Sequence, residues 1–116
     1  MQVSHLAVLA LQFCAPQGLW ATTYYAGIVA RIDPKKAKVV RKLRLSNGNA
    51  SGVTFARGSV WVSDAGFGRV DRIDPARGKI VKSYSVGLTP RDLVPVGRGL
   101  WVVEQGSNDV RRIQMP

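Results

Sequence analysis

Two carboxylates occupy equivalent positions in the chain and are the first candidates for chemistry. Asp64 lies three residues after Trp61, and Glu104 lies three residues after Trp101. Side chains of this type could hold a divalent cation, or act as a general acid and base, if the fold brought them together. The alternative is that each accepts backbone N–H bonds within its own glycine-rich loop. The choice depends on the elements that position them.

Groups suited to nucleophilic or metal catalysis are scarce. The only cysteine, Cys14, lies in an apolar stretch, and the only histidine is His5. The sequence has no Ser-His or Cys-His pairing, no Gly-Lys-Ser/Thr loop for a phosphate, and no cluster with metal-ligand spacing. It therefore favours a protein that is not an enzyme, with no cofactor and no metal site.

The charge balance is strongly positive, with 17 Lys and Arg against 7 Asp and Glu and a formal net charge of +10. Such a charge attracts polyanions over long distances. Six basic side chains fall within ten residues that contain no acid: Lys35, Lys36, Lys38, Arg41, Lys42 and Arg44. Two interpretations stay open: a solvated outer strand whose charge prevents edge pairing, or a patch that binds nucleic acid or phosphate.

An internal repeat organises the chain. Trp20, Trp61 and Trp101 recur at intervals of 41 and 40 residues. A second motif keeps the same interval, as Arg-Ile-Asp-Pro at 31–34 and 72–75 and as Arg-Ile-Gln at 112–114. Two markers in phase indicate nearly three copies of a unit of roughly 40 residues.

Each unit is predicted to form four short strands in an antiparallel meander, because the segments alternate in polarity and show no helical period. The Asp-Pro sequences at Asp33 and Asp74 predict hairpin turns. The three copies span about 6–46, 51–86 and 91–114 of one domain, and the third lacks its last strand. The predicted strands are 6–13, 19–23, 28–33 and 39–45, then 52–56, 59–63, 69–74 and 79–86, and finally 92–96, 100–104 and 109–114.

The pattern Gly-x-x-Trp-Val-x-Asp-x-Gly-x-Gly-x-Val-x-Arg-Ile-Asp-Pro-x-x-Gly-Lys-Ile-Val at 58–81 resembles a known group of repeats. These are the repeats of bacterial YVTN-type (YncE-like) and virginiamycin B lyase-like (streptogramin lyase-like) β-propellers. The resemblance implies four-stranded blades around a central axis, with the first strand of each blade innermost. Members of the lyase branch depend on histidines, a glutamate and a magnesium ion, and no member of that set can be placed here, since His5 precedes the first strand.

A closed propeller needs about four to eight blades, and fewer than three are encoded here. The expected fold is therefore an incomplete all-β propeller. Three explanations stay open: a fragment of a longer product, an oligomer that completes a ring between chains, or an open stack. The repeated tryptophans are expected to pack between blades.

The loops that join second to third strands are expected to share one face with the loops between blades, where propellers usually meet ligands. That face would bind a protein or a small molecule. Its candidate residues are Thr23, Tyr24, Asn47, Asn49, Asp64, Phe67, Thr89, Arg91, Glu104 and Asn108.

The function that the sequence favours is a non-enzymatic binding or interaction scaffold, as a fragment or an oligomerising part of a larger propeller. The alternatives are a fragment of a virginiamycin B lyase-like enzyme and a polyanion-binding protein that uses 35–44. Residues 6–15 are apolar and allow either a signal peptide or a first strand, and they are too short for a bilayer span of roughly 20 residues. An extracytoplasmic or secreted location is slightly favoured over a cytoplasmic one.

Overall fold

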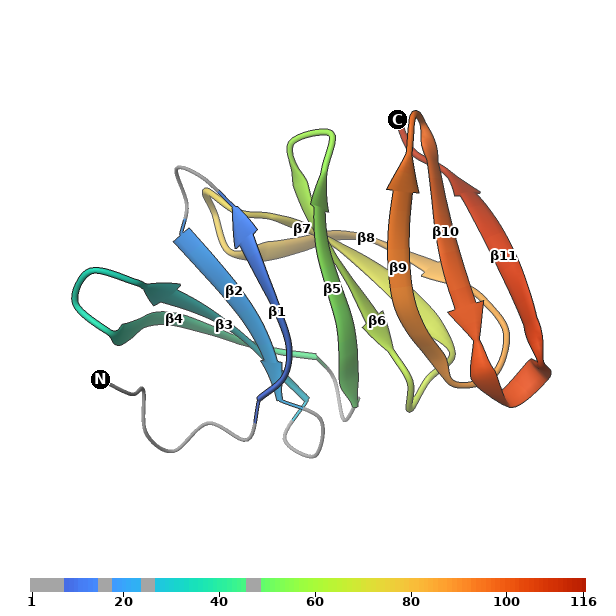
Figure 1. Cartoon of the computed structure of the whole chain (residues 1–116), viewed down its shortest axis with the longest axis horizontal. Helices are drawn as coiled ribbons and strands as arrows, with labels where there is room; N and C mark the ends of the chain where they lie inside the picture. Colours follow the sequence, from blue (N-terminus) through green and yellow to red (C-terminus); the bar gives the residue numbers. More distant parts are fainter. Residues whose placement is uncertain (1–7, 15–17, 24–26, 46–48) are drawn as a thin grey trace.

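The computed structural model describes residues 8–14, 18–23, 27–45 and 49–116. Its strands form three antiparallel sheets, in which each strand pairs with its neighbours in sequence (Figure 1). The first sheet holds β1 (Val8–Cys14), β2 (Gly18–Thr23), β3 (Ile28–Asp33) and β4 (Lys38–Arg44). The second holds β5 (Ala50–Ala56), β6 (Ser59–Asp64), β7 (Arg69–Asp74) and β8 (Lys79–Ser85). The third holds β9 (Pro90–Val96), β10 (Gly99–Glu104) and β11 (Asp109–Gln114), with a 3-10 turn, η1 (Gln105–Ser107), before β11.

The predicted all-β meander is confirmed, and most strand limits agree with the expected ones. The first strands of the second and third sheets begin two residues early, because Ala50 pairs with Asp64 and Pro90 pairs with Glu104 beyond an irregularity in the ladder. The first strand runs from Val8 rather than from position 6, and residues 6 and 7 lie outside the described part of the chain.

The two Asp-Pro turns form as predicted and close the β3–β4 and β7–β8 hairpins. The carboxylate of Asp74 accepts the N–H groups of Ala76 at 2.9 Å and Arg77 at 3.3 Å. Asp33 accepts the equivalent N–H groups in the first hairpin. Gly78 adopts the left-handed backbone with φ of 66°, and Ala37 adopts it at the same place without the help of a glycine. Both aspartates are thus turn residues.

The three sheets stand side by side as blades, with their first strands innermost. In Figure 1, β5 lies between β1 and β9, and contacts within the chain join β1 to β5 and β5 to β9. The outermost strand of the second blade is β8, and the third blade ends at β11. This is the arrangement of part of a β-propeller, as expected.

The hydrophobic core is divided between two blade interfaces. Between the first and second blades, Trp20 packs with Val60, Val62 and Ile73. Between the second and third blades, Trp61 packs with the equivalent residues Leu100, Val102 and Ile113. Both tryptophans are 0% exposed. The prediction that the repeated tryptophan packs between blades is confirmed for these two. Trp101, the third, is 39% exposed, because no described part of the chain covers its face of the third blade.

Buried hydroxyl groups link neighbouring blades near the inner strands. The Thr22 hydroxyl donates to the backbone oxygen of Ser51 at 2.7 Å. The residue at the same repeat position in the second blade, Ser63, donates to the backbone oxygen of Arg91 at 2.6 Å. The Ser51 hydroxyl bonds the backbone oxygen of Pro90 at 2.8 Å. Since buried polar groups are costly when unpaired, these bonds fix how closely successive blades approach.

Candidate functional site

The loops expected to form a common face do lie against one another. The Ala65 N–H in the β6–β7 loop donates to the Asn49 backbone oxygen at 2.9 Å, which ties that loop to the connection before β5. In the third blade the Gln105 N–H donates to the Thr89 backbone oxygen at 3.1 Å, in the same relation. These backbone hydrogen bonds tie each of the two loops to the connection that enters its blade.

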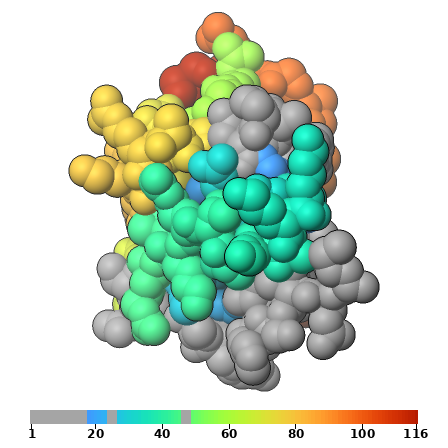
Figure 2. All heavy atoms as spheres, turned by 90° about the vertical axis from the view of Figure 1, so that its left-hand side faces the viewer, coloured from blue at the N-terminus to red at the C-terminus, as the bar shows by residue number. Residues whose placement is uncertain are grey.

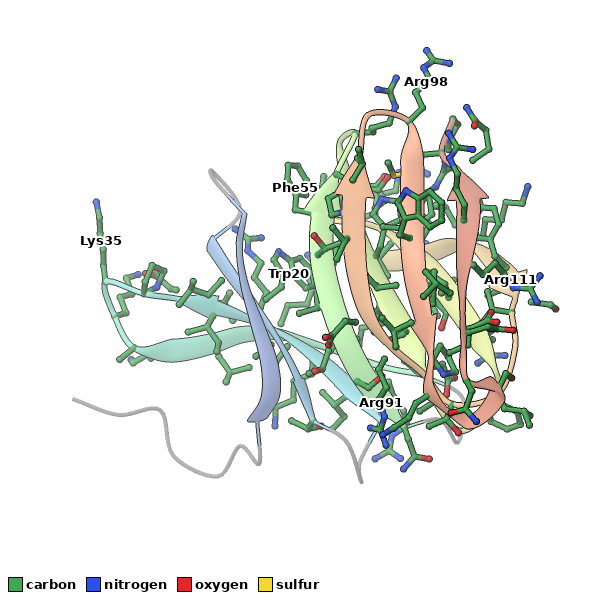
Figure 3. The ribbon with its side chains drawn as sticks, turned by 45° about the vertical axis from the view of Figure 1, so that its right-hand side comes forward. Trp20, Lys35, Phe55, Arg91, Arg98 and Arg111 are labelled. Atoms are coloured by element: carbon green, nitrogen blue, oxygen red, sulfur yellow. The ribbon has the colours of Figure 1, made fainter. Side chains whose placement is uncertain are left out.

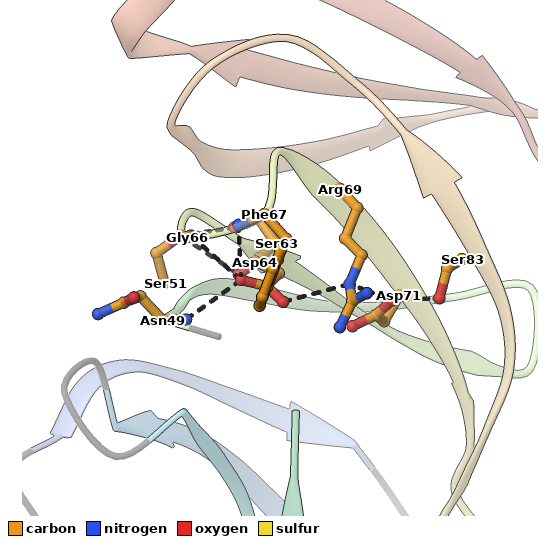
Figure 4. A network of polar contacts seen from close by, with 9 residues as sticks. All are labelled: Asn49, Ser51, Ser63, Asp64, Gly66, Phe67, Arg69, Asp71 and Ser83. Atoms are coloured by element: carbon orange, nitrogen blue, oxygen red, sulfur yellow. Dashed lines mark hydrogen bonds and ion pairs between the residues drawn. The ribbon is translucent and has the colours of Figure 1, made fainter. Parts of the chain in front are cut away.

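Asp64 is fully buried and holds its loop from within (Figure 4). One carboxylate oxygen accepts the N–H groups of Asn49 and Gly66, both at 3.1 Å, and of Phe67 at 3.3 Å. The other oxygen lies 3.2 Å from Nε of Arg69. Asp64 therefore has the structural role that was the alternative to catalysis or cation binding, because its carboxylate accepts backbone N–H bonds in its own loop.

Arg69 joins Asp64 to a second buried carboxylate that sequence reasoning missed. Nε of Arg69 lies 3.5 Å from Asp71, and the Ser83 hydroxyl donates to Asp71 at 2.6 Å (Figure 4). Burial raises the pKa of Asp71, and the Ser83 bond and the Arg69 charge oppose that rise. The signal in the sequence was an aspartate at a position where the first repeat has Ala30.

Glu104 plays the corresponding part in the third blade. Its carboxylate is 1% exposed and accepts the Gly87 N–H at 2.6 Å, in the connection that enters this blade. Nε of Arg111 lies 2.6 Å from the same oxygen. Burial alone would raise the pKa of Glu104, but hydrogen bonds from Asp109 and Gly87 and the charge of Arg111 together lower it. The hydrogen bond between Asp109 and Glu104 raises the pKa of Asp109.

The remaining loop-face candidates are distributed unevenly. Thr23 is buried and bonds Ile28 within its own loop, and Arg91 donates to the Gln105 side chain at 2.9 Å. Phe67 is 54% exposed, with the Arg69 guanidinium 5.1 Å from its ring centre. The rest are half-buried Asn49 and Thr89, exposed Asn108, and Tyr24 and Asn47, which lie outside the described residues.

The loop face thus presents its two repeated carboxylates to the protein and not to solvent. Asp64 and Glu104 are each bonded within their own blade, and no described contact links them. The described residues include no group of three His, Cys, Asp or Glu side chains placed to hold a metal ion. The chemistry available to these two residues as they stand is the fixing of the loops that precede β5 and β9.

A different surface stands out by its exposure. On the side of the third blade turned away from the second, five large apolar side chains are between 38% and 62% exposed. Their strand partners on the other side, such as Leu100 and Val102, are 0% exposed in the second core. We call this surface the open face, and it comprises Val94, Val96, Trp101, Val103 and Val110.

The basic run forms the outermost strand of the first blade and its preceding turn. Lys35 is labelled at the tip of the β3–β4 hairpin in Figure 3. Figure 2 shows this hairpin (teal to green) across the end of the molecule. Most of its basic side chains are exposed, whereas Arg41 is half-buried against Gly78 of the second blade. The described ion pairs of Arg69, Arg77 and Arg111 all lie outside the run.

Comparison with known proteins places the fold but no family. No protein-family model matches the chain, and no curated protein is similar to it in sequence. The chain is similar to solved β-propellers. Saccharomyces cerevisiae Sqt1 matches with a TM-score of 0.78 at 12% identity, over 94% of this chain and 31% of that one. Virginiamycin B lyase from Staphylococcus aureus matches with a TM-score of 0.72 at 16% identity, over 90% and 40%.

The RRP9 WD40 repeats are a third neighbour, with a TM-score of 0.69 at 11% identity, over 92% of this chain and 36% of that one. The chain therefore spans between about a third and two fifths of the length of these proteins. An enzyme and a set of WD40 repeats appear among them, so the likeness establishes a propeller-type fold and leaves the activity to the surfaces of this chain. In the part that the structure describes, no helix has the length and apolar character needed to cross a membrane.

Proposed function

We propose that the chain is a non-enzymatic interaction scaffold of the β-propeller type, and that its open face is the surface that binds a partner. The observation that carries this proposal is the exposure of Val94, Val96 and Trp101 on one sheet face, while the equivalent Trp61 is buried. Contiguous exposed apolar side chains on a soluble domain mark sites of interaction. The carboxylates that would have suggested catalysis are engaged in holding loops.

Site-specific photo-crosslinking in the producing cell tests this proposal. A photoreactive phenylalanine replaces Val94 on the open face, and a matched variant carries it at Val40, which is equally exposed on the outer strand of the first blade. The expected result is a covalent adduct from position 94, several-fold more abundant than from position 40, that disappears with Trp101→Lys. Equal yields from both positions, or none from position 94, would contradict the proposal.

A second candidate is polyanion binding through 35–44, which is supported by the absence of a described ion pair from Lys35, Lys38, Lys42 and Arg44. Phosphate contacts predict an affinity for duplex DNA that falls steeply between about 50 and 200 mM salt. The variant Lys38→Gln/Lys42→Gln/Arg44→Gln should lose that affinity, and Arg57→Gln/Arg98→Gln, which removes exposed charge elsewhere, should lose much less. A flat salt response would remove this candidate.

The finer family assignment, to YVTN-type or virginiamycin B lyase-like propellers, is also a proposal. It is supported by the repeat pattern at 58–81 together with the structural likeness to the lyase. The enzyme alternative that follows from it, a fragment of a lyase-like protein, is tested by incubating the purified chain with a streptogramin and magnesium. Turnover would replace the scaffold proposal with an enzymatic one.

A further inference from the structure

The second blade accepts the third through a glycine that the third blade does not repeat. A Cβ atom at Gly52, on the inner strand β5, would collide with the backbone oxygen of Arg91 on β9. No side chain fits at this position of the second blade unless the third blade moves. The equivalent residue of the third blade, forty positions on, is Asp92, and its side chain is exposed. A further blade packed in the same way would meet that carboxylate.

Three more positions on this face differ between the second and third blades. Ser63, which bonds the Arg91 backbone oxygen of the next blade, corresponds to Val103. Thr54 and Ala56 on β5 correspond to Val94 and Val96 on β9. The hydroxyl that links blades is lost, and the surface becomes more apolar, although an exposed sheet face ordinarily alternates toward polar residues.

The open face thus keeps the apolar character of an interface but not the fit for a blade. Trp101 and Val110 repeat Trp61 and Val70, which are buried at the second interface. Resting on the proposal that this face binds a partner, we propose that the partner is the open face of a second copy of the chain, with the two related by a two-fold axis.

The charges at the edges of the open face favour this occupant. Cross-strand pairing places Val94, Trp101 and Arg112 in one row across the three strands, and Asp92 lies two residues from Val94 along β9. The Arg112 guanidinium lies over Gly99 and donates to Oε1 of Gln114 at 2.9 Å, on the side of this row away from Asp92. A basic group on β11 and an acidic group on β9 therefore flank the apolar centre.

A two-fold axis parallel to β10 would make those charges complementary. It sets β11 of one copy over β9 of the other, in sheets packed about 10 Å apart. The Arg112 backbone then lies about 7 Å along the strand from Asp92 of the second copy. To meet that carboxylate, the guanidinium turns away from Gln114 and Gly99, which it contacts in the monomer. Trp101 meets Trp101 at the centre. An isologous pair of this kind is the commonest oligomer of soluble proteins.

The size of the face sets the expected strength. Three strands of six or seven residues cover about 20 Å by about 15 Å, given strand spacings near 4.8 Å and a rise near 3.3 Å. This footprint of about 300 Å² on each copy is well below the roughly 800 Å² per partner of a standard interface and belongs with weak, transient complexes. The dimer is therefore expected to form only at high protein concentration and to dissociate on dilution.

Sedimentation of the full chain, with charge-swapped variants, tests the arrangement. The parent chain should pass from monomer to dimer with concentration. Arg112→Asp and Asp92→Arg should each weaken the dimer by about tenfold, equivalent to about 1.4 kcal/mol, and the double variant Asp92→Arg/Arg112→Asp should recover most of that loss. Both residues are exposed, so circular dichroism is expected to show unchanged folding in every variant. A double variant no better than the singles would overturn the arrangement.

A cysteine at the axis separates this inference from the proposed function. Val103→Cys in a Cys14→Ser background should give a covalent dimer with a short bis-maleimide crosslinker, because facing sheets lie about 10 Å apart, too far for a direct disulfide. Val40→Cys in the same background should not. A chain that stays monomeric and gives no such dimer overturns the second copy as the partner. If photo-crosslinking from position 94 then captures another protein, the proposed function survives; if it captures nothing, both fail. Assembly beyond a dimer would likewise contradict a two-fold contact.

Discussion

The second and third blades are built from the same repeat, yet they differ more on one face than on the other. On the side turned toward the preceding blade, Val60, Val62 and Ile73 correspond to Leu100, Val102 and Ile113, and all six are buried. On the side turned toward the following blade, Gly52 corresponds to Asp92 and Ser63 to Val103. The face that is alike in the two blades is apolar in both. The opposite face differs between the second blade, where the third blade covers it, and the third blade, where it is exposed.

Exchanging the residue at the close-approach position should have the largest effect. Gly52→Asp forces a side chain into the Arg91 backbone and buries a carboxylate between blades. The free energy of unfolding should fall by more than about 4 kcal/mol, among the largest single-residue effects. Asp92→Gly, the reverse change on the open face, should alter it by less than about 1 kcal/mol. Chemical denaturation followed by circular dichroism compares the two, and equal losses would remove the distinction between the faces.

Truncating the repeated tryptophans gives the next largest contrast. Trp61→Ala empties a fully buried position in the second core and should lower the free energy of unfolding by about 3 to 5 kcal/mol. Trp101→Ala should cost much less in the dilute monomer, because that ring is already 39% exposed. Urea denaturation at low protein concentration measures both. A large loss for Trp101→Ala would show that its ring is packed in solution.

Removing the Ser63 hydroxyl between the blades should have a moderate effect on the free energy of unfolding. Ser63→Val removes bonds to Ser51, to the Gly52 N–H and to the Arg91 backbone oxygen. Leaving these buried groups unpaired should lower the free energy of unfolding by about 1 to 3 kcal/mol. Val103→Ser should leave the stability of the monomer nearly unchanged. Thermal unfolding of both variants provides the comparison, and a stable Ser63→Val would contradict a role for the hydroxyl in joining blades.

The smallest effect is a difference in pH dependence between the two blades. Asp71 has a raised pKa in the fold, so its contribution to stability is present below its ordinary pKa and is lost as pH rises through the folded value. Asp71→Asn should therefore gain stability relative to the parent as pH rises. Glu104 has a lowered pKa, so its contribution is present above its ordinary pKa and is lost as pH falls through the folded value.

Glu104→Gln should accordingly show its deficit at neutral pH, and the deficit should shrink in acid. Urea titrations of Asp71→Asn, Glu104→Gln and the parent at several pH values measure the two opposite slopes. Parallel stability curves for the three proteins would contradict the assigned shifts.

The repeat made most of the fold predictable. Alternating segments and the Asp33 and Asp74 turns depend on local interactions, so the strands and hairpins could be placed from the sequence alone. The positions of Asp64 and Glu104 on the loop face were also predictable. Their role was not, because it depends on the Asn49 and Gly87 N–H groups approaching from connections that are distant in sequence.

The open face illustrates a second limit. Asp92, Val94 and Val103 are visible in an alignment of the repeats, but the sequence does not say that position 52 touches the next blade. The structure shows this contact in the close approach of Gly52 to the Arg91 backbone. The expectation that every tryptophan is core was therefore wrong for Trp101, since the rule holds only where a neighbour is present.

The placement of both cores between sheets has a consequence for synthesis on the ribosome. Trp20 shares its core with Val60 and Ile73 as well as with Val29 of its own blade, so this core is completed only when more than fifty residues after Trp20 have been made. Likewise Trp61 waits for Leu100 and Ile113. The nascent chain therefore acquires stable structure in two late steps, each made by the arrival of a blade that completes the one before it.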